Sequence, residues 1–457
     1  MSAEGALGGI TPAWEDVRLI RDIVVERLST EGGRSEHRRE RGRAVIQEEV
    51  RAWAHKRVLA GQPPNGALEA ELQTRVFNSV FGLGRLQPLI ERPDVENIEI
   101  NGYDQVWMRT RTGELLRGEP VADSDQELVD ELRYIASQAG RSLSTTSPRL
   151  HMELPDGSRL AAVIETTRRP HAVIRRHLLQ DVTMNDLTAN GTISDSLRAF
   201  FVTAVRARKN IVVSGAQNSG KTTLMRGLVA LIPPHERFAT LEQEYELHLD
   251  RLGRHPHVVA MQVREGGSEY GPDGRPAGEV GLQDIVRDAL RMNLSRIVVG
   301  EVRGPEVVPM LDAMTTGDGG SLCTLHARSA RDAVERLVVL CGRYGIAPDI
   351  AYRVIAGAVD LIVHVDLLDD TWREGGRRLR YVREVVEVAG IAETGRPTIS
   401  DIYKPGADGR AEPTGVPPVC MPELQRAGLD PRWLQSAHST WHTPPARSTA
   451  PLRQVGA

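Results

Sequence analysis

The chain has 457 residues, enough for two or three domains, and a formal net charge of −4, which gives no general reason to expect a nucleic-acid partner. Aromatic residues make up 4% of the chain, too few for the stacking platforms that bind single-stranded nucleic acid. The three cysteines are an odd number without CxxC spacing, so neither a disulfide framework nor a zinc site is expected.

The first segment, residues 1–67, predicts a helical N-terminal arm. The stretch "EHRRERGRAVIQEEVRAWAHKRVLAG" carries apolar residues at helical spacing among many charges. An interaction arm and a solvated helical extension both fit this pattern. The run "GQPPNG" then interrupts the helical spacing.

The next segment, residues 68–177, predicts a small α+β domain. The dipeptides Asn101-Gly102 and Asp156-Gly157 precede β-rich runs and indicate tight turns. Residues 178–195 are polar and rich in turn-forming residues, which favours a linker.

The largest segment, residues 196–405, alternates helical and β-rich runs. This alternation predicts an α/β domain built on a mostly parallel sheet. Residues 406–457 are rich in Pro, Gly, Ser and Thr, and they predict a disordered tail that buries little apolar surface.

A phosphate-binding loop follows the first strand of the α/β segment. The apolar run "NIVV" leads into "SGAQNSGKTT" at 214–223, and "LMRGLVALI" continues as a helix. Backbone N–H groups of such a loop surround an anion, the lysine reaches the β- and γ-phosphates, and the following hydroxyl binds Mg²⁺. The expected nucleotide-binding residues are Ser214, Gly215, Ala216, Gln217, Asn218, Ser219, Gly220, Lys221, Thr222 and Thr223.

Three further strands end in residues suited to phosphate chemistry. "RIVVGEVRGPE" is a buried strand ending at Glu301, which would reach Mg²⁺ or an attacking water, or be an ordinary strand-end glutamate. "TLEQEYELHL" passes from a strand into an acidic patch, where Glu242 lies nearest the strand and is the candidate for a second carboxylate. "GSLCTLHARS" ends at His326, for which a structural role and a γ-phosphate contact are equally compatible with the spacing.

At these four motifs the sequence resembles the secretion and pilus-assembly ATPases of the type II/type IV traffic family, and within it the CpaF or Tad branch that serves Flp-type pili. The similarity runs from "GLGRLQPLIERPDVENIEING" to "TISDIYKP". "GAQNSGKTT" matches Walker A, "TLEQEYELHL" the acidic box, "RDALRMNLSRIVVGEVRGPE" Walker B and "AMTTGDGGSLCTLHARS" the His box. The resemblance implies a RecA-like P-loop ATPase domain preceded by a small α+β domain and the N-terminal helices.

The resemblance also implies roles for individual residues. Lys221 and Thr222 would hold the phosphates and Mg²⁺, and Glu301 would be a second group near the metal. The implied catalytic residues, which position or activate water, sense the γ-phosphate or supply positive charge, are Glu301, Glu242, His326, Arg175, Arg176 and Arg264. Arg175 and Arg176 end the last strand of the small domain, and either one matches an arginine that the family supplies from that domain.

The implied ligands are ATP and Mg²⁺, and the implied partners are further copies of the chain, forming a homohexamer, and an inner-membrane platform protein. We expect a cytoplasmic protein, because no stretch suits a membrane span or a signal peptide. The resemblance implies that this protein associates with the inner face of the cell membrane. A RecA-like nucleic-acid translocase and a non-hydrolysing ATP-bound assembly scaffold are the alternatives. The first would need a basic or aromatic channel, which the sequence does not indicate.

Overall fold

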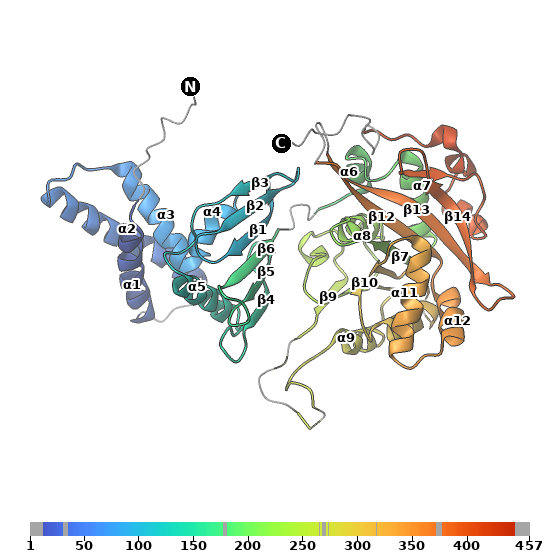
Figure 1. Cartoon of the computed structure of the whole chain (residues 1–457), viewed down its shortest axis with the longest axis horizontal. Helices are drawn as coiled ribbons and strands as arrows, with labels where there is room; N and C mark the ends of the chain where they lie inside the picture. The colour runs from blue at the N-terminus through green and yellow to red at the C-terminus, as the bar shows by residue number, and fades with distance from the viewer. Residues whose placement is uncertain are drawn as a thin grey trace, which may run out of the picture. The chain divides into compact units, whose positions relative to one another are not determined.

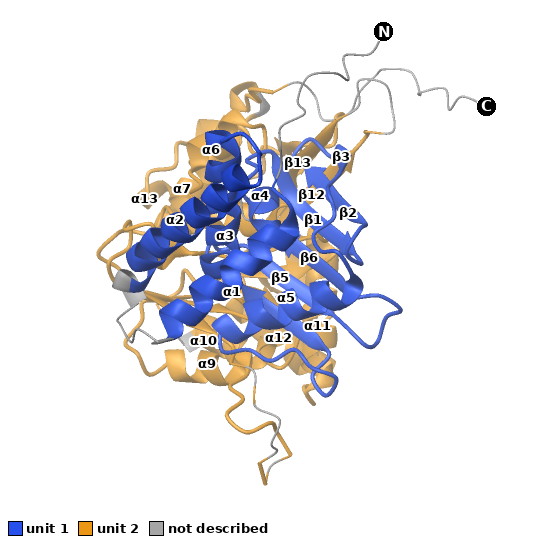
Figure 2. Cartoon of the chain, turned by 90° about the vertical axis from the view of Figure 1, so that its left-hand side faces the viewer, with its two compact units in different colours: residues 1–176 blue, residues 177–457 orange. Residues whose placement is uncertain are grey.

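The computed structural model describes residues 12–30, 35–176, 181–264, 266, 271–272, 274–316, 318–371 and 377–443. The chain divides into two compact units, residues 1–176 and 177–457, which Figure 2 shows in different colours.

The N-terminal helices of unit 1 form a three-helix bundle. It consists of α1 (Trp14–Thr30), α2 (Ser35–Leu59) and α3 (Gly66–Phe81). Their apolar faces meet in a common core made of Val17, Ile20, Val24, Leu28, Val45, Ile46, Val50, Leu72 and Val76. The interpretation as a solvated extension is therefore wrong for the described residues, because burying these apolar side chains stabilises the bundle.

A six-stranded antiparallel sheet completes unit 1, in the order β3-β2-β1-β6-β5-β4. Its strands are β1 (Val95–Asn101), β2 (Val106–Thr110), β3 (Leu115–Arg117), β4 (Arg149–Glu153), β5 (Arg159–Val163) and β6 (His171–Arg175). The short helices η1 (Gly84–Leu86) and α4 (Gln87–Ile90) precede the sheet, and α5 (Asp125–Gln138) packs on one of its faces (Figure 1). The two predicted tight turns are confirmed, since β1–β2 and β4–β5 are antiparallel neighbours.

Unit 2 is built on a nine-stranded sheet in the order β15-β14-β13-β12-β7-β11-β10-β8-β9. The run from β12 to β9 is parallel, and β13, β14 and β15 extend it as antiparallel strands. The strands are β7 (Ile211–Gly215), β8 (Phe238–Glu242), β9 (Val258–Gln262), β10 (Arg296–Val302), β11 (Leu322–His326), β12 (Leu361–Asp369), β13 (Arg378–Ile391), β14 (Pro397–Pro405) and β15 (Ala411–Pro413). The predicted mostly parallel sheet is confirmed.

Helices cover both faces of this sheet (Figure 1). They are α6 (Met184–Ala189), α7 (Asp195–Arg206), α8 (Lys221–Val229), η2 (Leu249–Arg251), α9 (Leu282–Ala289), α10 (Val307–Thr316), α11 (Ala330–Arg343), α12 (Pro348–Ala358), α13 (Met421–Arg426), η3 (Pro431–Leu434) and η4 (Ser436–His438). Neighbouring residues of β7 serve opposite cores: Ile211 and Val213 pack with α7 and α8, whereas Val212 packs with α9 to α12. A strand buried on both faces explains the continuous apolar run that precedes the phosphate loop.

The segment predicted as a linker is part of the folded body of unit 2. A reciprocal capping box between Thr183 and Asp186 starts α6. Leu187 and Ile193 are fully buried in the same core as α7 and α8. The linker prediction is wrong for residues 182–195, because a few apolar side chains in a polar stretch suffice to anchor it, and residues 178–180 lie outside the described part of the chain.

The predicted disordered tail is also largely folded. Residues 406–443 include β15, which pairs with β14, and α13, whose Leu424 is fully buried in the core. The Glu387 side chain accepts hydrogen bonds from the backbone N–H groups of Val419 and Cys420 at 2.7 and 2.8 Å. Composition missed this segment because it is held by scattered anchors on β13 and β14; residues 444–457 lie outside the described range.

All three cysteines are free and buried. Among the residues that the structure describes, no helix is both long and apolar enough to cross a lipid bilayer.

The folded C-terminal segment leads to a stability prediction. Leu424→Ala removes a fully buried side chain and should destabilise the chain by about 2–5 kcal/mol, the range for large-to-small core substitutions. Val419→Ala, five residues earlier and 74% exposed, is the matched control and should change the melting temperature little. Differential scanning calorimetry of both variants would test this, and equal melting temperatures would mean that α13 does not contribute to the core.

Candidate nucleotide site at the carboxyl edge of the parallel sheet

The phosphate loop lies between β7 and α8, as the sequence predicts. The loop residues 216–218 are exposed, whereas Ser219 and Lys221 are buried. Asn218 has a φ of 61° and Gly220 a φ of 96°, both in the left-handed region that reverses the chain direction. Gly220 caps α8, so the N-terminal N–H groups of that helix face the loop and favour an anion.

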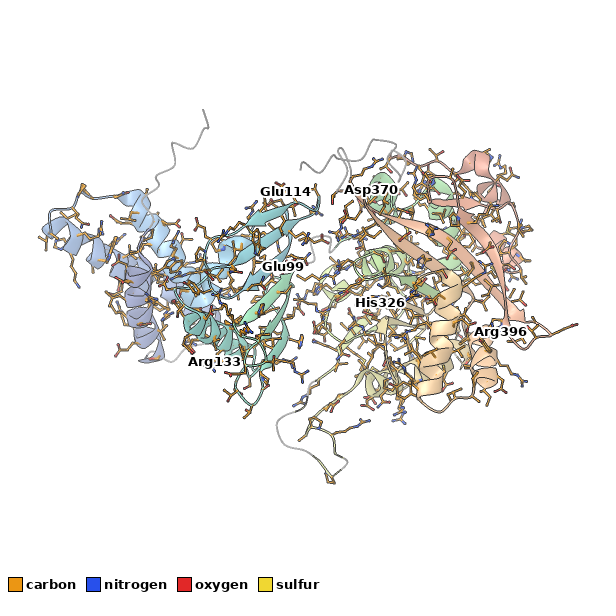
Figure 3. All side chains as sticks on the ribbon, viewed as in Figure 1. Glu99, Glu114, Arg133, His326, Asp370 and Arg396 are labelled. Atoms are coloured by element: carbon orange, nitrogen blue, oxygen red, sulfur yellow. The ribbon has the colours of Figure 1, made fainter. Side chains whose placement is uncertain are left out.

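Lys221 connects the loop to the neighbouring strand. Its Nζ donates a hydrogen bond to the Ala216 carbonyl at 2.8 Å and lies 3.3 Å from His326 Nδ1. His326, labelled in Figure 3, ends β11, the strand beside β7. It pairs in register with Gly215 of β7. The parallel register therefore places the lysine and the histidine at the same edge of the sheet.

Glu301 continues this series of contacts. Its Oε1 lies 2.7 Å from His326 Nε2, and its Oε2 accepts a hydrogen bond from Arg303 at 2.6 Å. Burial by itself would raise the pKa of Glu301, but the contacts with His326 and Arg303 outweigh it and lower the pKa to about 2. Glu301 is therefore ionised across the neutral pH range.

Glu242, at the end of β8, has a different environment. It is 2% exposed, and its Oε2 accepts the backbone N–H groups of Glu246 and Leu247 at 2.8 and 2.9 Å. Burial raises the pKa of Glu242 to about 7, although the two N–H groups partly oppose this shift. A side chain at Gly300 would place its Cβ 3.0 Å from Glu242 Cγ, which explains the glycine before Glu301.

The structure brings two residues to the site that the sequence did not single out for it. Thr222 Oγ1 donates to Glu246 Oε2 at 3.2 Å, so one of the acidic-patch residues contacts the phosphate-loop helix. The Arg226 guanidinium, almost fully buried on α8, donates to the Glu246 carbonyl. An arginine within the apolar helix "LMRGLVALI" was the available signal, since a buried charge needs a partner.

Other predicted phosphate-loop residues have supporting positions. Ser214 is buried in β7, and its Oγ lies 3.0 Å from Nδ1 of His364 on β12. Burial lowers the pKa of His364, which favours a neutral imidazole ring beside Ser214. Gln217 is exposed, and Thr223 lies half-buried in the first turn of α8.

Three predicted site arginines are not brought into the contacts just described. Arg264 is exposed, and its backbone forms a bridge with Val280. Arg175 and Arg176 end the β6 region of unit 1. The Arg176 guanidinium donates to the carbonyls of Arg92 and Val95, and burial lowers its pKa, whereas the described residues give Arg175 no hydrogen-bonded side-chain partner.

Two orphaned polar atoms fit a bound nucleotide and metal. Within the described ranges, Ser219 Oγ and Glu242 Oε1 are buried and lack hydrogen-bond partners. A hydroxyl suits a phosphate oxygen, and a carboxylate oxygen suits Mg²⁺ or its water. The described residues contain no group of three or more His, Cys, Asp or Glu that could hold a metal ion.

Comparison with known proteins decides the family. Residues 101–411 match the family described as "Type II/IV secretion system protein". The chain belongs to this type II/IV secretion family. The resemblance drawn from the four motifs is confirmed at the level of this family. The fold, in which an α/β P-loop domain follows a smaller N-terminal domain along the chain, is that of the family.

Several family members are similar over most of their length. A putative conjugal transfer protein of Mycobacterium tuberculosis is 31% identical, covering 71% of this chain and 91% of its own. The type IV secretion system protein PtlH of Bordetella pertussis is 30% identical, covering 66% and 93%.

Solved structures that are similar to this secretion-family chain include the VirB11 ATPase of the Brucella suis type IV secretion system, with 25% identity, a TM-score of 0.34 and coverage of 69% of this chain and 95% of that one. The pilus retraction motor PilT has 18% identity, a TM-score of 0.45 and coverage of 68% and 84%.

The buried Glu242 generates a prediction for the pH dependence of stability. In the folded chain the pKa of Glu242 is about 7, whereas the pKa of an ordinary glutamate is 4.5. Between these values the unfolded state binds fewer protons, so this group makes the parent less stable as pH rises, with the full penalty above pH 7. The glutamine of Glu242→Gln cannot ionise. We therefore expect the free energy of unfolding of this variant, relative to that of the parent, to increase by about 1–3 kcal/mol when the pH is raised from about 5 to about 8.

Chemical denaturation of the nucleotide-free chain at the two pH values measures this gain. The exposed Glu279→Gln is the control and should follow the parent at both pH values. Parallel pH profiles for Glu242→Gln and the parent would contradict a folded-state proton on Glu242.

Proposed function

We propose that the chain hydrolyses ATP and that this turnover powers pilus assembly or protein secretion. The observation that carries the proposal is the series of contacts from Lys221 through His326 to Glu301, which runs from the phosphate loop to the strand-end carboxylate. Membership of the type II/IV secretion family supports the same conclusion.

In this proposal water attacks the γ-phosphate of ATP in line, and most of the catalysis comes from positioning and charge neutralisation. The loop N–H groups and Lys221 would bind the phosphates, and His326 would contact the γ-phosphate. Thr222 and Glu301 would hold Mg²⁺, which when bound neutralises charge on the β- and γ-phosphates.

The two glutamates have complementary properties in this reaction. Glu301 is ionised and held by two partners, which suits a group that orients water or faces a metal. Glu242 has a pKa near 7, and a proton acceptor works best when its pKa lies near the operating pH. We infer that Glu301 orients the water and that Glu242 is the stronger candidate for accepting its proton.

The arginines complete the proposal. We infer that Arg175 supplies positive charge to the γ-phosphate, because Arg176 already donates to two backbone carbonyls in its own unit. Arg264, exposed after β9, is proposed as a further arginine of the site.

We further propose a homohexamer that acts on an inner-membrane platform protein from the inner face of the membrane. The motif pattern supports the CpaF or Tad branch, which assembles Flp-type pili. The names of the relatives, which include conjugal transfer and type IV secretion proteins, support a machine that moves macromolecules across a membrane.

The first functional prediction separates binding from turnover. Lys221→Ala should abolish phosphate release, because the loop loses the cation that reaches the phosphates. Glu301→Gln keeps the shape of the side chain and should bind ATP without turnover. Phosphate release, equilibrium ATP binding and circular dichroism measure these outcomes.

The parent chain and Glu242→Gln are the necessary comparisons. Near-normal turnover by Lys221→Ala would exclude the proposed site. A parent that binds ATP but releases no phosphate, with or without lipid, would favour the scaffold alternative. If Glu242→Gln stops turnover and Glu301→Gln does not, Glu301 has no essential part in the reaction.

The second functional prediction splits the two neighbouring arginines. Arg175→Ala should lower kcat by roughly 10³–10⁵, the range for an arginine that stabilises a transferring phosphoryl group. Arg176→Ala should instead lower the melting temperature, since the carbonyls of Arg92 and Val95 lose their donor. Turnover against ATP concentration, with light scattering to check assembly, separates the two effects, and a parent-like kcat for Arg175→Ala would rule out its proposed role.

A further inference from the structure

An arginine outside the four motifs contacts the phosphate loop. Arg380 lies near the start of β13 and pairs with Leu367 of β12. The pairing of β12 with β7 ends at Val365 and Gly215, where the loop begins. The final residues of β12 and the first residues of β13 therefore extend beyond the edge of the parallel sheet, alongside the loop.

The contact is made at the two loop residues with left-handed backbones. Arg380 Nε donates a hydrogen bond to the Asn218 carbonyl at 2.9 Å. Its Cδ lies 3.2 Å from the position that a Cβ would take at Gly220. One side chain thus contacts Asn218 and lies next to Gly220, although no sequence motif links Arg380 to the loop.

This hydrogen bond fixes the orientation of a peptide group that belongs to the anion site. In a trans peptide the C=O and the following N–H point in opposite directions. Because the Asn218 carbonyl is held toward Arg380, the Ser219 N–H points away from Arg380, and it donates a hydrogen bond within the loop to the Ala216 carbonyl at 3.4 Å. A left-handed residue other than glycine is costly, so an external partner helps to maintain it.

Arg380 is itself held on a rigid element. β13 lies between β12 and β14 in the sheet, and the N–H of Val382 donates to the Thr192 carbonyl at 2.8 Å. A guanidinium on such a strand also adds a fixed positive charge beside the loop, which favours a bound polyanion.

We propose that Arg380 is a positioning residue of the phosphate loop, holding the Asn218–Ser219 peptide so that the loop N–H groups face a nucleotide phosphate. This inference rests on the proposed nucleotide binding at the same loop. The loop cradles the α- and β-phosphates, so Arg380 acts on ADP and ATP alike.

The test compares Arg380→Ala and Arg380→Lys in the full chain. Calorimetric titration with ADP should show binding weakened on the order of tenfold in Arg380→Ala, the effect of losing one charge-assisted hydrogen bond. KM for ATP should rise by a similar factor while kcat changes little, and Arg380→Lys should recover part of the loss because it restores a cation. Melting temperature and light scattering should match the parent.

Arg396→Ala is the matched control, because Arg396 lies at the turn between β13 and β14, at the opposite end of β13 from Arg380. Figure 3 labels Arg396 and also Asp370, which precedes β13. The Arg396→Ala variant should bind ADP like the parent. Parent-like ADP affinity in Arg380→Ala, or a loss of melting temperature with no change in KM, would overturn the proposal. Lys221→Ala distinguishes a failure of this proposal from a failure of the proposed nucleotide site. If Lys221→Ala also binds ADP like the parent, nucleotide binding at this loop is wrong. If Lys221→Ala loses ADP binding and Arg380→Ala does not, only the role of Arg380 is wrong.

Discussion

The parallel register of four strands in unit 2 is the constraint on which the candidate site depends. β7, β11, β10 and β8 are consecutive in the sheet, so their carboxyl ends meet at one edge. Glu242, Glu301 and His326 lie within the last two residues of β8, β10 and β11, and Lys221 starts the helix after β7. The register brings Lys221 and His326 together although 105 residues separate them in the chain. Apolar packing on both faces maintains the register, and the chemistry at the edge follows from it.

Solvation and hydrogen bonding then give two identical side chains different properties. Glu301 and Glu242 are both partly or fully removed from water, which favours the protonated form of a carboxyl group. Arg303 and His326 compensate at Glu301, whereas Glu242 receives only two backbone N–H groups and keeps one unpartnered oxygen. A site with one carboxylate that stays charged and a second whose pKa lies near neutral pH has the groups needed both to orient water and to accept a proton.

The antiparallel strands β13 to β15 connect the candidate site with segments outside the parallel sheet of unit 2. β13 carries Arg380 to the phosphate loop and contacts residue 192 through Val382. Glu387 of the same strand accepts hydrogen bonds from the backbone N–H groups of Val419 and Cys420 just before α13, and Leu424 of α13 is buried in the core. The strands beyond the parallel sheet thus connect the loop with two segments whose composition had suggested a linker and a disordered tail.

Local chemistry was sufficient to predict the α/β class and to single out the phosphate loop, the strand-end glutamates and His326 as candidate site residues. Each depends on a short run of neighbouring residues: a buried strand, glycines that permit an anion-binding turn, and a polar group at a strand end. Only the tertiary structure decided that Glu246 contacts Thr222, that Arg226 donates to the Glu246 carbonyl and that Arg380 contacts the loop. The difference in pKa between Glu242 and Glu301 also became evident only there. These properties depend on burial and on contacts between residues far apart in the chain, which a single sequence does not encode in any local pattern.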